Sequence, residues 1–252
     1  MKLFDKHFWK EGPGSFAIAI LIALTIRWAV LEAYVIPSGS MLPSLLINDH
    51  IFVNKFVYGL RYPFTEEWIF RANNPVKGEV IVFKYPENID IFYIKRVVGT
   101  AGDRIFYENG NLYVNGEIIE KKVPNELKSE FDWLTDDVLR GEGPNARDNY
   151  THWEEKLGSR NYSTLLRKGE RLNNSFGPIV VPKDSYFVMG DNRDNSKDSR
   201  FWDPDKMFVP HSYLVGRAAF IWLSCDKKIP SVNFLCNPLT IRWKRFFHSV
   251  HD

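Results

Sequence analysis

The most continuous run of apolar residues lies near the N-terminus, in the segment 15–36, which reads SFAIAILIALTIRWAVLEAYVI. Thr25 is the only polar residue between Phe16 and Ile26. A helix over residues 15–36 would be about 33 Å long, enough for a hydrocarbon layer of roughly 30 Å. We therefore expect one N-terminal transmembrane helix. Its apolar span is short, from about Gly14 to Trp28, because the charge of Arg27 favours the membrane surface.

The cations on either side of this segment predict its orientation. Lys2, Lys6 and Lys10 precede it, whereas after Arg27 no Lys or Arg occurs before Lys55. Because positive flanks stay in the cytoplasm, residues 1–14 are expected to form a cytoplasmic tail, with the rest of the chain on the extracytoplasmic side of the membrane. A cleaved signal peptide is the alternative, but no small-x-small cleavage site follows the apolar run.

Short apolar or alternating runs dominate the rest of the chain, bounded by Gly, Pro and Asn-Gly pairs. Two Asn-Gly pairs, Asn109-Gly110 and Asn115-Gly116, predict tight hairpins. Such runs predict strands rather than helices. The expected fold class is mainly β, with an antiparallel β-sheet core and an insert. The predicted strands cover residues 50–58, 80–85, 92–98, 104–107, 112–114, 117–119, 179–181, 186–189 and 213–223.

Residues 120 to about 177 differ in composition, because they are rich in charge and poor in β-branched side chains. Gly141, Gly143, Pro144 and Gly158 interrupt them. We interpret 105–178 as an irregular inserted subdomain with some helix, between two parts of the core at 37–104 and 179–238. Residues 239–252 are expected to form a basic amphipathic segment, which either touches lipid or packs on the core as a terminal helix.

The overall charge excludes one class of partner. The chain has 33 Lys and Arg against 31 Asp and Glu, a net charge of +2, and it carries no nucleic-acid-binding motif. Nucleic acid is therefore not expected as a partner. Aromatic residues make up 15% of the chain, which suits either a lipid-facing surface or aromatic-rich strands. Cys225 and Cys236 could form a disulfide outside the cytoplasm or remain free thiols, and the sequence leaves both open.

A polar loop follows the apolar segment and offers a candidate nucleophile. It reads PSGSMLPS over residues 37–44, with Ser40 beside Gly39, which permits close approach of a substrate. Ser38 supplies a second hydroxyl two residues away. A serine needs a neighbouring base and a group that stabilises the oxyanion, so the rest of the chain has to supply both.

Lys95 is the candidate base. In the predicted strand, alternation places Lys95 on one face with Tyr93 and Val97, and Arg96 on the other. Loss of hydration between apolar neighbours favours a neutral amine, which can accept a proton. An ordinary ion-paired lysine on an edge strand is the alternative.

A third polar stretch, GDNRDNSKDSR at 190–200, directly follows a predicted strand. Asp191, Asp194 and Asp198 have a spacing that resembles a calcium loop, but the EF-hand glycine and terminal Glu are absent, so we expect no metal. Arg193 and Arg200 could pair with these carboxylates, and Ser196 could hold a lysine head in place.

Together, the segments PSGSMLPSL, YIKRVVGTAGD and GDNRDNSKDSR resemble those of bacterial type I signal peptidases, in the same order. INDHIFVNKFVYG at 47–59 and KGEVIVF at 77–83 are also similar to segments of that family. The resemblance covers most of 27–104 and 179–224, and leaves the insert and both ends uncovered.

This resemblance implies a membrane-bound serine endopeptidase that cleaves signal peptides from exported pre-proteins, after small residues of the Ala-x-Ala type. It implies Ser40 as nucleophile and Lys95 as general base, without a cofactor and without any of the six histidines. Ser38, with the Ser40 amide, would stabilise the oxyanion, and Ser196 would orient the lysine. The residues implied to brace the site are Arg96, Asp191, Asp198 and Arg200.

Some features depart from the family pattern. The chain has one expected anchor where some members have two, and Phe201-Trp202-Asp203-Pro204 lacks the usual glycine after the tryptophan. A relative that matures a narrow substrate such as a pilin, a self-cleaving repressor and a catalytically silent membrane-tethered binding module are the alternatives. The anchor in place of a DNA-binding domain argues against the repressor.

Overall fold

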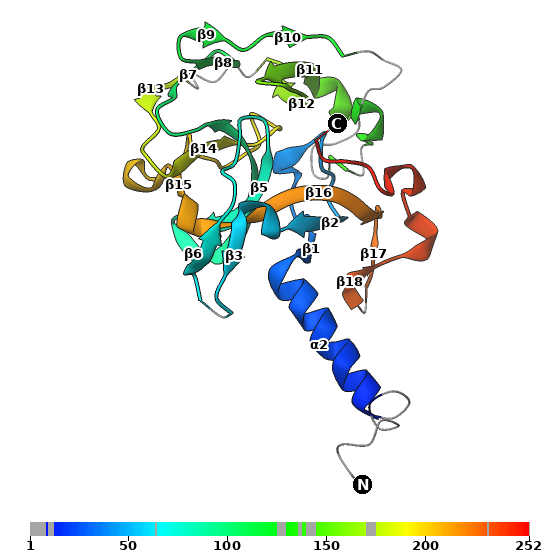
Figure 1. The fold of residues 1–252 in the computed structure, drawn as a ribbon. Coiled ribbons are helices and arrows are strands. Elements are labelled where there is room, and N and C mark those ends of the chain that lie inside the picture. Colours follow the sequence, from blue (N-terminus) through cyan, green and yellow to red (C-terminus); the bar gives the residue numbers. More distant parts are fainter. Residues whose placement is uncertain are drawn as a thin grey trace.

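The computed structural model describes residues 9, 13–63, 65–124, 130–135, 138–139, 145–169, 175–230 and 232–251. Helix α2 (Pro13–Ala29) projects from one end of a body made of antiparallel sheets (Figure 1). The mainly β, antiparallel prediction is confirmed. The strands of the first half are β1 (Leu31–Val35), β2 (Asp49–Asn54), β3 (Gly59–Arg61), β4 (Trp68–Arg71), β5 (Val80–Tyr85), β6 (Asn88–Gly99), β7 (Arg104–Glu108), β8 (Asn111–Val114), β9 (Glu117–Ile118) and β10 (Lys121–Lys122). Those of the second half are β11 (Tyr150–Leu157), β12 (Arg160–Arg167), β13 (Phe176–Val180), β14 (Ser185–Met189), β15 (Val209–Pro210), β16 (Leu214–Ser224), β17 (Lys228–Ile229) and β18 (Val232–Cys236).

Within the described residues the largest sheet has the strand order β1-β2-β16-β5-β6-β14-β15. Its centre is β5, where Val80 and Val82 pack in one apolar cluster while Ile81 and Phe83 pack in another. Because successive side chains of a strand point to opposite faces, the sheet is covered on both faces at this strand. This explains why β5 reads as a continuous apolar run instead of an alternating one.

Among the described residues, β3 with β4 and β17 with β18 form two-stranded sheets, and two further sheets have three or four strands. One has the order β13-β7-β8-β9, and its turns use Asn109-Gly110 and Asn115-Gly116, all four with positive φ. The Asn-Gly hairpin predictions are therefore confirmed. The other sheet, β10-β11-β12, lies at the end of the molecule opposite α2 (Figure 1).

The insert is more regular than its sequence predicts. Strands β11 and β12, eight residues each, form a hairpin within the stretch expected to be irregular. The helix expected there is not found among the described residues, where Glu130–Trp133 and Ala146–Asn149 form 3₁₀ turns. The irregular-subdomain prediction is wrong for this hairpin, whose strands pair in regular register and which buries one charged residue, Glu155, against Arg193.

The apolar N-terminal segment is shorter as a helix than expected. Helix α2 ends at Ala29, and Leu31–Val35 pairs with β2 as strand β1, so the helical prediction for 15–36 is wrong beyond Ala29. In the part of the chain that the structure describes, no helix combines the length and hydrophobicity needed to cross a bilayer, so the predicted transmembrane helix is not supported.

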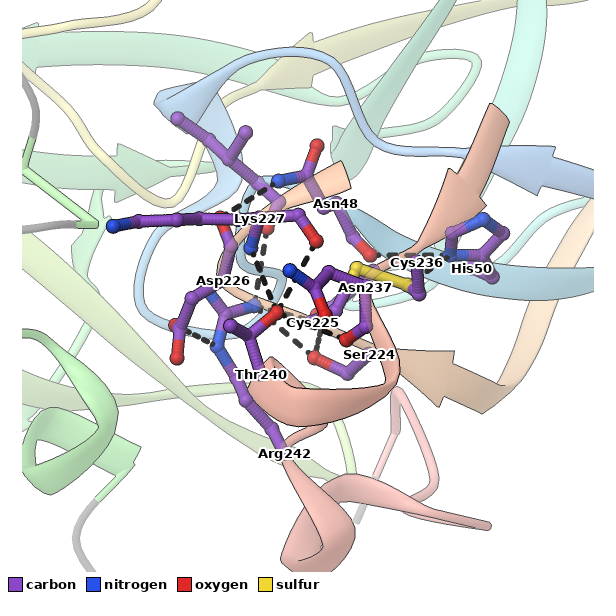
Figure 2. The surroundings of a disulfide bond; sticks show 12 residues. Asn48, His50, Ser224, Cys225, Asp226, Lys227, Cys236, Asn237, Thr240 and Arg242 are labelled. Atoms are coloured by element: carbon purple, nitrogen blue, oxygen red, sulfur yellow. Dashed lines mark hydrogen bonds and ion pairs between the residues drawn. A yellow bond between two sulfur atoms is a disulfide. The ribbon is translucent and has the colours of Figure 1, made fainter. Parts of the chain in front are cut away.

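Among its described residues, the C-terminal segment does not form the terminal helix that was the alternative to a lipid-touching basic amphipathic segment. It forms 3₁₀ turns at Pro238–Thr240 and Trp243–Arg245 and then runs along β16. Arg245 is fully buried and donates to Asp49 Oδ2 at 2.6 Å. A basic side chain can be buried where a buried carboxylate pairs with it, as Asp49 does here. Cys225 and Cys236 form a disulfide that ties β18 to the end of β16 (Figure 2).

Candidate active site

Ser40 lies in a short 3₁₀ turn, Gly39–Met41, between β1 and β2. The residues that follow it fix this turn by packing in two directions. Met41 and Leu45 join the apolar cluster on the main sheet, whereas Leu42 and Leu46 join a cluster with insert residues such as Leu165. The nucleophile candidate is therefore held between the sheet and the insert.

Lys95 reaches Ser40 from strand β6. Its Nζ donates a hydrogen bond to Ser40 Oγ at 2.7 Å and another to the Ile94 carbonyl oxygen at 3.0 Å. Lys95 is 4% exposed and Ser40 is 9% exposed. The Nζ atom also lies 5.2 Å from the centre of the Tyr93 ring, the neighbour that strand alternation predicts.

Burial changes the proton affinity of this amine. Loss of hydration lowers the pKa of Lys95 to about 8, although the negative charges of Asp198 and Asp191 act in the opposite direction. About a tenth of Lys95 is therefore neutral at pH 7, far more than for an exposed lysine, and a neutral amine can accept the Ser40 proton.

Ser38 lies beside this pair on the exposed side. Its Oγ is 3.4 Å from Ser40 Oγ, and its side chain is exposed. A hydroxyl in this place can donate to an oxyanion that forms when Ser40 attacks a carbonyl.

Arg96 points to the opposite face of β6, as predicted, and binds Asp191. Its Nε and Nη2 donate to the two Asp191 carboxylate oxygens at 2.8 and 2.6 Å, and both side chains are buried. Ser44 Oγ donates to Asp191 Oδ2 at 2.6 Å. This bidentate pair connects the lysine strand to the loop at 190–200.

Asp198 and Arg200 form a second buried pair within that loop. Arg200 Nε and Nη2 donate to Asp198 Oδ1 and Oδ2, both at 2.8 Å. Burial alone would raise the pKa of Asp198, but the adjacent Arg200 guanidinium lowers it. The carboxylate also accepts from the Gly190 amide at 2.9 Å, so the loop is closed on itself.

Ser196 is buried close to the site but does not make the contact that its predicted role requires. A Cβ placed on Gly190 would lie 2.2 Å from Ser196 Oγ, so the two residues are in close contact. Among the described residues, Ser196 Oγ makes no hydrogen bond to Lys95. Its orienting role stays a prediction.

Sequence reasoning missed two residues that hold the nucleophile. The Asn192 amide donates to the Ser40 carbonyl oxygen at 3.1 Å, and Asn192 Nδ2 donates to the Gly39 carbonyl oxygen at 3.1 Å. Gly190 leaves the space next to Ser40, because an added Cβ would lie 2.5 Å from the Ser40 carbonyl oxygen. Asn192 lies within the polar stretch already singled out, but nothing in its spacing indicates a bond to residues 39 and 40.

A groove of about 370 Å³ opens over the pair and is lined by both strand β6 and the loops. Strand β6 pairs with β5 at residues 92–96 and again at Asn88, but with β14 only from Arg96 onward. Among the described strands, the second edge of residues 91–94 is thus without a partner. The lining residues are Pro37, Ser38, Gly39, Ser40, Ile91, Phe92, Tyr93, Ile94, Lys95, Asn195 and Lys197.

The described residues contain no cluster of side chains suited to bind a metal ion. Among the described residues, no group of three or more His, Cys, Asp or Glu side chains is placed to hold a metal ion. Of the described histidines, His211 bonds Tyr186 and His251 bonds the Ala218 carbonyl, and neither bond involves Ser40.

Comparison with known proteins gives a consistent result. A family model described as "Signal peptidase, peptidase S26" matches residues 9–223. A signal peptidase I of Pseudomonas aeruginosa is 39% identical over 233 residues, covering 88% of this chain and 75% of the relative. Signal peptidase I of Pseudomonas fluorescens is 36% identical, covering 94% of this chain and 79% of the relative. Signal peptidase I of Aquifex aeolicus is 36% identical, covering 88% and 87%.

The family model covers most of the chain, and these relatives align over nearly its whole length. This chain therefore belongs to the signal peptidase family S26 and is a signal peptidase, a hydrolase of the serine peptidase class that cleaves signal peptides.

Proposed function

We propose that Ser40 is the nucleophile and Lys95 the general base of a Ser-Lys dyad. The observation that carries this proposal is the 2.7 Å contact between Ser40 Oγ and the buried Lys95 Nζ. Neutral Lys95 accepts the hydroxyl proton as Ser40 Oγ bonds to the scissile carbonyl carbon. The resulting ammonium then gives that proton to the leaving amide nitrogen as the C–N bond breaks. The mature protein leaves, and the signal peptide remains as an ester on Ser40.

Deacylation uses the same groups in reverse. Lys95 accepts a proton from a water molecule, whose oxygen attacks the ester carbon, and the proton returns to Ser40 Oγ as the ester C–O bond breaks. Ser38 Oγ and the Ser40 amide stabilise the oxyanion in both steps. The exposed position of Ser38, 3.4 Å from Ser40 Oγ, supports this role.

The buried ion pairs brace the dyad. Arg96 with Asp191 holds the lysine strand against the loop at 190–200, and Asp198 with Arg200 keeps that loop closed. Ser196 orients the lysine amine when substrate occupies the groove. Its burial beside Gly190 supports a place in this site.

The signal peptide lies in the groove as an added strand along residues 91–94 of β6. Main-chain hydrogen bonds supply affinity in such an arrangement, and pockets for alternate side chains supply specificity. The shallow groove over Ser40 favours small side chains at the first and third positions before the cleaved bond, as in Ala-x-Ala.

The enzyme is bound to the inner membrane through its N-terminal segment, in a single pass. Apolar side chains on α2 are exposed in the described structure, among them Phe16, Ile20 and Leu21, and lipid would remove them from water. Residues 1–14 are cytoplasmic, and the catalytic body lies on the extracytoplasmic side. This body consists of two core parts, residues 37–104 and 179–238, with the insert 105–178 between them.

Processing of a model pre-protein by the detergent-solubilised full chain tests this function. Wild type should release the mature protein, and Ser40→Ala should release none at equal enzyme concentration. Thr65→Ala, which alters an exposed hydroxyl in the β3–β4 turn, is the matched control and should cleave normally. Full cleavage by Ser40→Ala would contradict the proposal.

A further inference from the structure

The insert hairpin contacts the loop at 190–200 directly. Residues 191–194 run beside β12, where Leu165 forms a parallel bridge with Asn192. The Leu165 amide donates to the Asp191 carbonyl at 2.9 Å, and the Arg193 amide donates to the Leu165 carbonyl at 3.0 Å. These bonds make the loop an additional strand-like edge of the insert.

A buried ion pair fixes this junction. Arg193 Nη1 and Nη2 donate to Glu155 Oε1 and Oε2 at 2.9 and 2.5 Å. The Arg193 side chain is 1% exposed and that of Glu155 is fully buried. Tyr162 Oη donates to Glu155 Oε2 at 2.8 Å, so the carboxylate is held by its own hairpin as well. A charge-assisted bidentate pair of this kind restricts both partners in distance and direction.

The junction lies one residue from the contacts that hold the nucleophile. Asn192, next to Arg193, donates to the carbonyl oxygens of Ser40 and Gly39. The Arg193 carbonyl accepts from Arg200 Nη2 at 2.7 Å, which extends the connection to Asp198. From the insert side, the Tyr162 ring lies 4.3 Å from the Arg96 guanidinium, next to Lys95 in the chain.

We propose that Glu155 is a positioning residue for the reaction, which acts through Arg193 and Asn192 to hold the Ser40 turn at Lys95. The insert therefore sets the geometry of the catalytic pair. This inference rests on the proposed roles of Ser40 and Lys95. Its specific consequence is that a change at Glu155 lowers the rate of the chemical step more than it alters binding of the pre-protein.

The test uses the full chain with a model pre-protein, measuring kcat and KM separately together with near-ultraviolet circular dichroism and the thermal unfolding midpoint. Glu155→Gln keeps the shape but removes the charge. Glu154→Gln is the control, because Glu154 is its neighbour on β11 and pairs with Lys122 at 2.8 Å, away from the loop. We expect Glu155→Gln to lower kcat by about tenfold or more with KM changed less than threefold. Glu154→Gln should match wild type.

A second variant protects the test against simple misfolding. In Glu155→Met with Arg193→Met both charges of the buried bidentate pair are removed together, so neither member of that pair is left as an unpaired ion. Lys121, whose Nζ lies 3.8 Å from Glu155 Oε1, loses this carboxylate in both variants. We expect a folded protein that also loses kcat with nearly unchanged KM. Hydrogen exchange at the Asn192 amide should accelerate in both variants, since its bond to Ser40 loosens.

Three outcomes would overturn the inference. Wild-type kcat in either folded variant would show that the pair does not position the site. Equal losses in kcat and in folded fraction would show that the Glu155–Arg193 pair has a structural role alone. Failure of both variants to fold would show the same. Ser40→Ala in the same assay separates this inference from the proposed function: if that variant still cleaves, the dyad itself is wrong.

Discussion

Ser40 Oγ lies 2.7 Å from Lys95 Nζ although 55 positions separate the two residues in the chain. Each is held by a different part of the fold, Ser40 by a turn packed between the sheet and the insert, and Lys95 by strand β6. Asn192 bonds the backbone of the turn and Asp191 bonds Arg96 beside the lysine. The loop at 190–200 thus joins the two halves of the proposed dyad.

Lys95→Arg should abolish cleavage despite keeping the positive charge. Arginine cannot lose its proton at accessible pH, so no base remains for Ser40. We expect a loss of roughly 10²–10⁴-fold in kcat, measured on a model pre-protein. Lys84→Arg on β5 is the control, since Lys84 pairs with Glu66 outside the groove. An arginine variant with appreciable activity would rule out the assigned base.

Lys95→Met should stabilise the protein at pH 7. The pKa of buried Lys95 is lowered from 10.5 to about 8, so below pH 8 folding carries the cost of a buried ammonium, worth up to about 3 kcal/mol. In wild type this cost disappears as the pH rises from 8 to 10.5, because the folded state binds fewer protons than the unfolded state in that window. Urea unfolding at pH 7 and pH 10.5 should show a gap between variant and wild type that narrows at the higher pH. A gap that is constant with pH would contradict the lowered pKa.

Gly190→Ala should reduce cleavage strongly. The new methyl group would lie 2.5 Å from the Ser40 carbonyl oxygen and 2.2 Å from Ser196 Oγ, so the nucleophile turn would have to move. We expect kcat to fall about tenfold or more. Gly102→Ala is a useful control, because no atom lies within 4 Å of its added Cβ, although its positive φ costs about 1 kcal/mol of stability. Equal rates for the two variants would show that the close approach at Gly190 is unimportant.

Removing the disulfide should lower stability without removing activity. Cys225 and Cys236 are 11 positions apart, and opening a loop of this size costs about 3 kcal/mol through the entropy of the unfolded chain. Figure 2 shows the bond between β18 and the end of β16, beside Asp226 and Arg242. Chemical denaturation of Cys225→Ser with Cys236→Ser measures this difference. Unchanged stability would mean that the neighbouring hydrogen bonds alone hold the β17–β18 hairpin in place.

The sheet core and the three polar stretches could be predicted from the sequence, because each has a local signal. Continuous apolar residues predict β5, and Asn-Gly pairs predict the turns on either side of β8. Ser40 and Lys95 lie in stretches whose residue types suit acyl transfer, and the structure brings them together.

The insert hairpin and the C-terminal segment could not be predicted. Each contains a charged residue that is buried against an oppositely charged residue distant in the sequence. Glu155 lies in a strand that reads as a solvated, charged stretch until Arg193 is placed against it. Arg245 reads as a surface cation, but it binds Asp49, 196 positions away. Strand β1 could not be distinguished from the preceding helix by sequence, because its apolar residues continue the run that forms α2.

The pH dependence of kcat/KM between pH 5 and 10 is the most direct test of the central claim, that Lys95 acts as a neutral base. The pre-protein should have no titratable side chain near its cleavage site, so that the profile reports the free enzyme. The pKa of about 8 predicts a plateau above this pH and a tenfold fall per pH unit below it. A rate that stays constant down to pH 6, or falls only in the range of carboxylates, would contradict the account.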